Sequence, residues 1–225
     1  MIPYKDDNPT SIIPVVTVGI IILNIAVYLW EVFSPSGEQK MVFSYGAVPH
    51  NMLTLNKVQP VHPIATVFTS MFMHGGLFHL GGNMLYLWVF GNNIEDRLGH
   101  VRFLVYYLLA GAAAAYAHAF AEPDSLIPMI GASGAVSGVL GAYLIIFPQA
   151  RVHSILFFGF FWQFVRVPAL IVIGFWAIIQ LVNGVVTKGL MGQSGVAWFA
   201  HVGGFLFGLL TIKLWLVGRR SKQWL

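Results

Sequence analysis

Ser133 and His201 are two side chains of this sequence whose types could form a hydrolytic pair. Ser133 opens an apolar run that ends at Pro148, and His201 lies a few residues into another apolar run. A serine hydroxyl is a weak nucleophile at neutral pH and needs a base within ~2.6–3.2 Å. A desolvated histidine tends to stay neutral, which suits that role. The two residues therefore predict nucleophilic catalysis by Ser133 with His201 as its base.

Such a reaction also needs hydrogen-bond donors for the oxyanion of the tetrahedral intermediate. His79 and Asn83 are four residues apart, so they share one face of a helix. We expect these two side chains and the backbone amide of Ser133, at the start of its helix, to supply the donors. One such donor can be worth roughly 10²–10³ in rate.

We expect a dyad without a carboxylate, because every acidic residue falls at the end of an apolar run or in a loop. The acidic residues are Asp6, Asp7, Glu31, Glu38, Glu95, Asp96, Glu122 and Asp124. The sequence predicts that Glu95 and Asp96, with Arg97 and Arg102, form a charge cluster that fixes a turn.

Each candidate residue also has a structural interpretation. Ser133 could serve helix packing, His201 could hydrogen-bond between helices, and His79 and Asn83 could hold helices together. Their joint occurrence favours catalysis. The segment Gly-Ala-Ser-Gly-Ala at 131–135 is not a Gly-x-Ser-x-Gly elbow, which argues against an α/β-hydrolase.

Neither a metal nor another cofactor is expected. His74 and His79 are five residues apart, so they do not share a helix face, and no carboxylate joins them. The chain has no cysteine, which removes thiolate ligands and disulfides. His118 has no matching partner, so we expect it to be structural.

The composition indicates that membrane helices position these residues. Of the 225 residues, 57% are hydrophobic and 9% are charged. A soluble protein usually has about 25% charged residues, so this chain cannot cover a water-facing surface. Open sheets cannot sit in lipid, and the alternation of a membrane barrel is missing. We therefore expect an all-α integral membrane protein, with a net charge that reflects topology and no nucleic-acid partner.

The apolar runs predict one six-helix domain at 12–217, between a segment at 1–11 and a basic tail at 218–225. The six predicted helices are 12–33, 77–90, 103–121, 133–147, 167–186 and 196–217. A polar loop is expected at 34–62, a charged turn at 91–102, a short loop at 122–130 and a small Gly/Ser loop at 187–195. An interfacial or re-entrant piece is expected at 63–73, and an aromatic, interfacial connection at 149–166.

The distribution of lysine and arginine predicts the orientation. Nine of the twelve lie at the N-terminus, in the loops after the second and fourth helices, and at the C-terminal end. We therefore expect both termini in the cytoplasm and the second, fourth and sixth helices to begin at the outer face of the cell membrane. This orientation brings the candidate residues to one depth, where ionisable side chains in a membrane indicate function.

Small residues could bring the fourth and sixth helices together. His201, Gly204 and Gly208 share one helix face, and Ser137 and Gly141 continue the face of Ser133. Such stripes let helices approach closely, which would join His201 to Ser133. A helix of 15 residues spans only ~22 Å, against a hydrocarbon core of ~30 Å. Ser133 could therefore lie at the floor of a wet cavity that opens to the outer face.

Four segments together resemble the rhomboid family of intramembrane serine proteases. They are HGGLFHLGGN at 74–83, EDRLGHVRF at 95–103, GASGA at 131–135 and AHVGGFLFG at 200–208, in the family's order. The resemblance implies a six-transmembrane-helix, rhomboid-like bundle with Ser133 as nucleophile and His201 as general base. It also implies an oxyanion site from His79, Asn83 and the Ser133 amide, with Gly131 in the loop that shapes it.

The resemblance also implies the partners. Substrates would be membrane proteins with an unstable transmembrane helix, cut near its outer end within the lipid bilayer. The loop between the fifth and sixth helices would act as a cap, and the fifth helix as a lateral gate.

Two positions depart from the family pattern. Ala65 and Thr66 stand where many relatives carry Trp-Arg, so we expect that loop to be anchored differently. Ser137 stands where some relatives have an aromatic residue that packs on the histidine. Support for His201 is therefore expected from elsewhere.

Two other functions stay open on the sequence. One is a catalytically silent, rhomboid-like protein that binds membrane helices, against which the presence of both Ser133 and His201 argues. The other is a transporter or channel, against which the lack of intramembrane acidic or arginine residues and of an inverted repeat argues.

Overall fold

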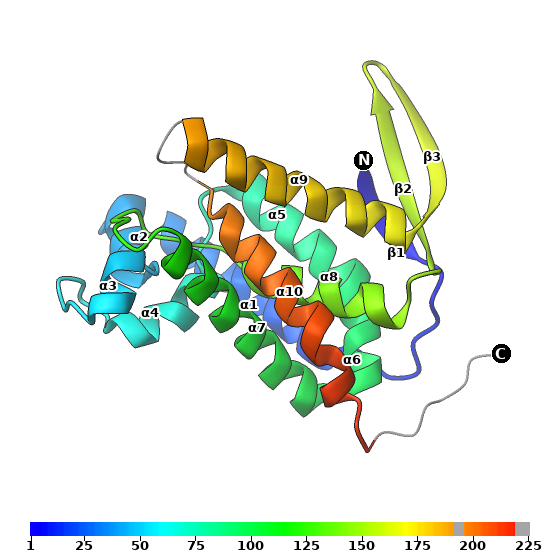
Figure 1. Cartoon of the computed structure of the whole chain (residues 1–225), viewed down its shortest axis with the longest axis horizontal. Coiled ribbons are helices and arrows are strands. Elements are labelled where there is room, and N and C mark those ends of the chain that lie inside the picture. The colour runs from blue at the N-terminus through cyan, green and yellow to red at the C-terminus, as the bar shows by residue number, and fades with distance from the viewer. Residues whose placement is uncertain (191–195, 219–225) are drawn as a thin grey trace.

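Long apolar helices dominate the computed structural model, which describes residues 1–190 and 196–218 (Figure 1). Four of them are long and apolar enough to cross a membrane. These four are α1 (Val15–Val32), α7 (His100–Ala121), α9 (Ala169–Leu190) and α10 (Trp198–Trp215). The helix α8 (Ser133–Ile146) is apolar but shorter. The chain is therefore a helical membrane protein, with four such spans in its described part, and the count of six stays a prediction.

The second predicted helix continues further than expected. The helix α5 (Leu77–Tyr86), the π-helical η2 (Leu87–Gly91) and α6 (Asn92–Leu98) follow one another without a break. The predicted turn at 91–102 is therefore wrong, and the chain turns at Gly99 with a φ of 73°. Ile94 and Leu98 are buried, so the apolar pattern continues beyond Gly91. A Cβ atom on Gly91 would lie 3.3 Å from Thr17 Cγ2, so this glycine permits packing against α1.

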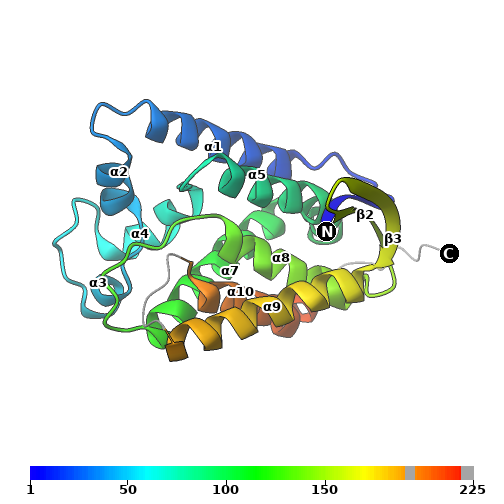
Figure 2. The same ribbon diagram turned by 90° about the horizontal axis from the view of Figure 1, so that it is seen from above.

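A three-stranded antiparallel sheet corrects the all-α prediction. Its strands are β1 (Ile2–Asp6), β2 (Arg151–Phe158) and β3 (Phe161–Pro168), in the order β1-β2-β3. The segment predicted as a plain interfacial connection is thus a hairpin, turned at Gly159 with a φ of 61°. This sheet does not break the rule against open sheets in lipid, because it lies beyond one end of the helices (Figure 2).

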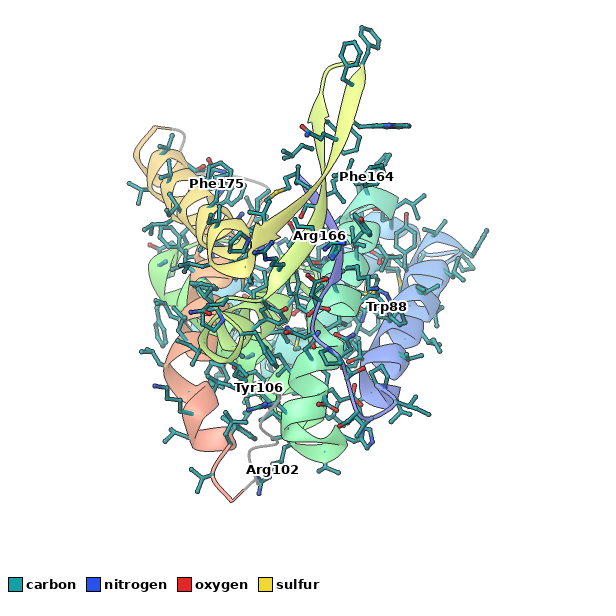
Figure 3. The ribbon with its side chains drawn as sticks, turned by 90° about the vertical axis from the view of Figure 1, so that its right-hand side faces the viewer. Trp88, Arg102, Tyr106, Phe164, Arg166 and Phe175 are labelled. Atoms are coloured by element: carbon teal, nitrogen blue, oxygen red, sulfur yellow. The ribbon has the colours of Figure 1, made fainter. Side chains whose placement is uncertain are left out.

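The hairpin extends sideways beyond the helices (Figures 1 and 3). Phe164 lies along it in Figure 3, and its ring packs edge-on against Tyr4 of β1. Asp7 and His153 pair where β1 meets β2. The hydrogen bond with His153 holds the pKa of Asp7 below its usual value. The first residues of the chain therefore fix the base of the hairpin.

The segment predicted as a polar loop at 34–62 is also partly helical. It contains α2 (Glu38–Tyr45) and α3 (Pro49–Thr54). The apolar piece that follows forms α4 (Pro63–Thr69) and the 3₁₀ turn η1 (Ser70–Phe72). Gln59 binds this region together, because its amide donates to the carbonyl oxygens of Phe43 and Gly46. These short helices lie at the end of the bundle opposite the sheet (Figure 2).

Glu95 caps a helix and is not in a surface turn. It lies in α6, fully buried, which corrects the prediction that all acidic residues are in loops or at the ends of apolar runs. Its carboxylate accepts hydrogen bonds from the amides of Val16 and Thr17 and from the Thr17 hydroxyl. The first amides of a helix have no intrahelical partner, so this carboxylate stabilises the start of α1.

Arg102 has the complementary role at a C-terminus. It donates to the carbonyl oxygens of Trp215 and Val217, just where α10 ends. The loop predicted at 187–195 begins too early, because α9 continues to Leu190. The rest of that loop, at 191–195, and the basic tail with Arg219, Arg220 and Lys222 lie outside the described residues.

Candidate active site

The structure brings Ser133 and His201 together. Ser133 is the first residue of α8, and His201 is the fourth residue of α10. The His201 Nε2 atom lies 2.8 Å from the Ser133 Oγ atom. This distance is within the range over which a base can take the proton of a serine nucleophile.

Glycines on both helices make this approach possible. A Cβ atom on Gly204 would lie 2.0 Å from the Gly134 carbonyl oxygen, and one on Gly208 would lie 2.1 Å from the Gly138 carbonyl oxygen. A Cβ atom on Gly141 would lie 2.2 Å from the Phe205 carbonyl oxygen. Real side chains cannot occupy these positions, so α8 and α10 pack backbone against backbone. The predicted close contact between the two small-residue faces is confirmed.

Gly131 lies between the His79 ring and the Ser133 hydroxyl. Its φ is +120°, a conformation that L side chains rarely adopt. A Cβ atom there would lie 2.8 Å from His79 Nε2 and 3.6 Å from Ser133 Oγ. The Gly131 amide donates to the Ser70 carbonyl oxygen, which ties this loop to η1. The structure therefore places Gly131 and His79 beside the serine.

Asn83 lies one turn beyond His79 on α5. It is buried, and its Nδ2 atom has no hydrogen-bond partner within the described part of the chain. A buried donor without a partner costs about 1–3 kcal/mol. Among the described residues that line the cavity at Ser133, Asn83 is absent. It is thus the one predicted side chain that the structure does not bring into this cavity.

A cavity of about 360 Å³ opens over the serine. Ser133, His79 and His201 form one part of its wall, and the loop before α8 forms another. His118 and Glu122, from the end of α7, also line it. The cavity therefore offers polar groups to water and to a peptide segment, and His118, which we expected to be structural, lies in its wall.

His74 lies against His79 but outside the cavity. The two ring centroids are 5.1 Å apart, and the His74 amide donates to the carboxylate of Glu31. Glu31 is fully buried in the last turn of α1. In the part of the chain that the structure describes, no three His, Asp or Glu side chains could hold a metal ion.

Gln180 is a site residue that the sequence analysis missed. Its Oε1 atom lies 2.7 Å from His201 Nδ1, the ring nitrogen that faces away from the serine. Gln180 lies in α9 and is buried. The signal in the sequence is an amide within an apolar segment, but Asn183 follows it there, and only a carboxylate was expected as a third member beside Ser133 and His201.

The two departures from the family pattern have clear outcomes. The Ser137 hydroxyl donates to the Ser133 carbonyl oxygen and does not reach His201. The rings of Trp176 and Trp198 lie about 6 Å from that of His201, centroid to centroid, so the prediction of support from elsewhere is confirmed. Ala65 and Thr66 lie within the short helix α4, where the Thr66 hydroxyl donates to the Pro63 carbonyl oxygen.

Comparison with known proteins finds relatives that are named as rhomboid proteins. The rhomboid domain model matches residues 62–218. "Presenilin-associated rhomboid-like protein, mitochondrial" of Bos taurus is 30% identical over 198 residues, which are 86% of this chain and 47% of that protein. "Rhomboid protease AarA" of Providencia stuartii is 28% identical over 228 residues, which cover 92% of this chain and 74% of that protein. The chain spans about half the length of the presenilin-associated relatives that it matches.

Proposed function

This chain belongs to the rhomboid family, and we propose that it is an intramembrane serine endopeptidase that cuts transmembrane segments of membrane proteins. The observation that carries the proposal is the 2.8 Å approach of His201 Nε2 to Ser133 Oγ at the wall of an open cavity. A silent helix-binding protein would not need this pair or the positive-φ glycine beside it.

The first half of the reaction forms an acyl-enzyme. The Ser133 Oγ atom attacks the carbonyl carbon of the scissile peptide bond while its proton passes to His201 Nε2. The tetrahedral intermediate carries an oxyanion, which the Ser133 amide, His79 and Asn83 stabilise as donors. The C–N bond then breaks, and His201 gives its proton to the leaving amine.

The second half consumes water. A water molecule attacks the ester carbon while His201 Nε2 takes one of its protons. The bond from the carbonyl carbon to Ser133 Oγ breaks, and the serine recovers its proton from His201. The cavity admits this water, because its wall contains His118 and Glu122 as well as the pair.

The proposal extends to the substrate and to the setting in the membrane. The protease domain is the six-helix unit at 12–217, with α5 and α8 completing the spans. Both termini face the cytoplasm, and the cavity opens to the outer face of the cell membrane. Substrates are membrane proteins with an unstable transmembrane helix, since such a helix can unwind toward Ser133. The partners are those substrates and the lipid bilayer, with no nucleic acid.

A fluorophosphonate probe tests the proposal, because it reacts with an activated serine and needs no known substrate. We expect the wild type to be labelled, and Ser133→Ala and His201→Ala to lose labelling and cleavage of a transmembrane substrate. Ser137→Ala is the matched control, since it removes a hydroxyl from the same helix that bonds only to a backbone carbonyl. An unlabelled wild type that still binds transmembrane helices would replace the proposal with the silent binding protein.

A further inference from the structure

Gln180 supplies a partner for His201 from a third helix. Its Oε1 atom lies 2.7 Å from His201 Nδ1, while His201 Nε2 lies 2.8 Å from Ser133 Oγ. Gln180 is 7% exposed. A polar side chain in an apolar, lipid-facing helix is costly unless it is partnered. This contact gives the amide such a partner.

The contact decides which nitrogen of His201 carries the proton. A neutral imidazole has one N–H donor and one acceptor nitrogen, and an amide oxygen can only accept. With Oε1 facing Nδ1, the hydrogen resides on Nδ1. The lone pair of Nε2 is then free to accept the proton of the Ser133 hydroxyl.

We propose that Gln180 is the positioning residue of a Ser133–His201–Gln180 relay, accepting the Nδ1 hydrogen of His201 so that Nε2 faces Ser133 as a base. The inference rests on the proposed serine peptidase function. No proton passes to Gln180 at any step. When Nε2 takes the serine proton, both ring nitrogens carry hydrogens, and the Gln180 oxygen continues to accept from Nδ1.

An amide suits this position better than a carboxylate. A carboxylate within an apolar helix would have to be desolvated, and that cost can exceed its attraction to the imidazolium. An amide oxygen fixes the same ring nitrogen without a buried charge. This explains how His201 is oriented although no acidic side chain contacts it in the described part of the chain.

The face of α9 that carries Gln180 is built for close packing on α10. Trp176, Gln180 and Gly184 follow at intervals of four residues and so share one helix face. The Trp176 ring packs near His201. A Cβ atom on Gly184 would lie 3.2 Å from Trp198 Cβ, so α9 approaches the start of α10 closely. His201 therefore keeps this orientation only while α9 packs against α10.

An apolar cavity of about 200 Å³ between α9 and α10 touches both members of the contact. Besides Gln180 and His201, its described lining residues are aliphatic or aromatic, Trp176 and Phe205 among them. Apart from the indole of Trp176, no lining side chain there can compete for the amide. The contact is thus the polar link between these two helices at this depth.

Three variants test the relay. Gln180→Leu removes the acceptor, Gln180→Glu keeps an acceptor that cannot donate when ionised, and Val182→Ala changes a lipid-exposed residue two positions away. The measurements are the fluorophosphonate labelling rate, kcat and KM for a transmembrane substrate, and thermal unfolding in detergent. We expect Gln180→Leu to lower the labelling rate and kcat about 10–100-fold with KM unchanged, because the base loses its orientation. Gln180→Glu keeps the acceptor but must desolvate it, so it should lose less rate than Gln180→Leu, and Val182→Ala should stay within about threefold of the wild type.

The pH profile separates positioning from packing. The titratable groups that act on His201 from the elements around it are His79 on α5 and His118 on α7. A carboxylate at 180 would add a charge opposite to that of a protonated His201. The acid limb of the plot of kcat against pH should therefore lie at higher pH for Gln180→Glu than for the wild type. Loss of packing alone would not move it.

The outcomes separate this inference from the proposed function. A wild type that is not labelled overturns both. A labelled wild type with Gln180→Leu equally fast overturns the relay alone. Equal slowing in Gln180→Leu and Gln180→Glu, with an unmoved pH profile, would make Gln180 a packing residue. If Gln180→Leu does not fold, the Gln180→Glu rate and profile still decide.

Discussion

The Nε2 atom of His201 lies 2.8 Å from the Oγ atom of Ser133 although 68 positions separate the two residues. The register of α8 and α10 sets this distance. Gly204 packs on the backbone of Gly134, and Gly208 packs on that of Gly138, so the two helices keep the same offset over a full turn. Ser133 and His201 lie at one end of this row of glycine contacts, which we call the glycine seam.

Gly208→Ala should therefore move Ser133 and His201 apart, although Gly208 touches neither of them. The new Cβ atom would lie 2.1 Å from the Gly138 carbonyl oxygen, so the helices must move apart or tilt. We expect a loss of ~1–3 kcal/mol in unfolding free energy, as for overpacked cores, together with slower fluorophosphonate labelling. Thermal unfolding and labelling of the same preparation measure both.

Gly174→Ala is the matched control for this variant. It is also a glycine in the middle of an apolar helix, but a Cβ atom there meets nothing within 4 Å. Both substitutions gain the same helix propensity, ~1 kcal/mol in favour of alanine. Equal stability and equal labelling of the two variants would show that the glycine seam does not set the distance.

Gly131→Ala should abolish activity while leaving the fold intact. Its φ of +120° is strained for alanine, and the methyl group would lie 2.8 Å from His79 Nε2. The loop or the ring must shift, which displaces the donors beside the serine. We expect labelling to fall by about 10²-fold or more, the effect of losing one oxyanion donor.

Gly82→Ala serves as the control for Gly131→Ala. It lies on α5, where a Cβ atom meets nothing within 4 Å. Normal labelling of Gly131→Ala, with thermal unfolding equal to that of Gly82→Ala, would remove Gly131 from the site.

Asn83→Ala distinguishes a donor for catalysis from a residue that holds helices together. The buried Nδ2 atom has no partner in the described chain, so deleting it removes a cost of about 1–3 kcal/mol instead of a bond. We expect kcat to fall by roughly 10²-fold with KM nearly unchanged and thermal stability equal or higher. A clear loss of stability with unchanged kcat would assign Asn83 to packing.

His79→Ala gives the companion measurement. His79 is beside Gly131 and in the cavity wall, whereas Asn83 is outside it. If both donate to one oxyanion, the double variant should lose less than the product of the single losses, because residues that act together are not additive. Independent, multiplicative losses would mean that they serve different steps.

Local sequence signals predicted the helix that carries Ser133 well. The structure begins α8 at Ser133 and ends it at Ile146, one residue before the predicted end. Gly131 before the serine and Pro148 after the helix are start and stop signals within the segment itself. The pairing of Ser133 with His201 was also predictable, because both helix faces carry small residues at fixed intervals.

Contacts between distant segments were not predictable in the same way. The pairing of Ile2 with Ile155 joins β1 to β2, two strands that most of the chain separates. Glu95 was assigned to a surface turn because nothing nearby indicates that its partner is Thr17, 78 positions away. Gln180 was missed for a chemical reason, since an amide can orient a histidine as a carboxylate does.

The aromatic hairpin predicts where the membrane surface lies. Phe160 at its tip and Trp162 and Phe164 on β3 are exposed, and the hairpin extends sideways from one end of the helices (Figures 1 and 3). Aromatic side chains collect at the membrane interface, so the hairpin should lie along the headgroups of one membrane face. Because the chain has no cysteine, Phe160→Cys provides one thiol for a polarity-sensitive fluorophore.

In vesicles, the probe at position 160 should emit at shorter wavelength than in water and should be quenched by lipids brominated near the headgroup. Asn56→Cys is the control, because Asn56 is exposed between short helices at the opposite end of the bundle. The probe there should report water. A probe at 160 that reports water and escapes quenching would place the hairpin in water, free of the bilayer. In that case the exposed rings would need a protein surface, since exposed apolar patches of this kind mark contact sites.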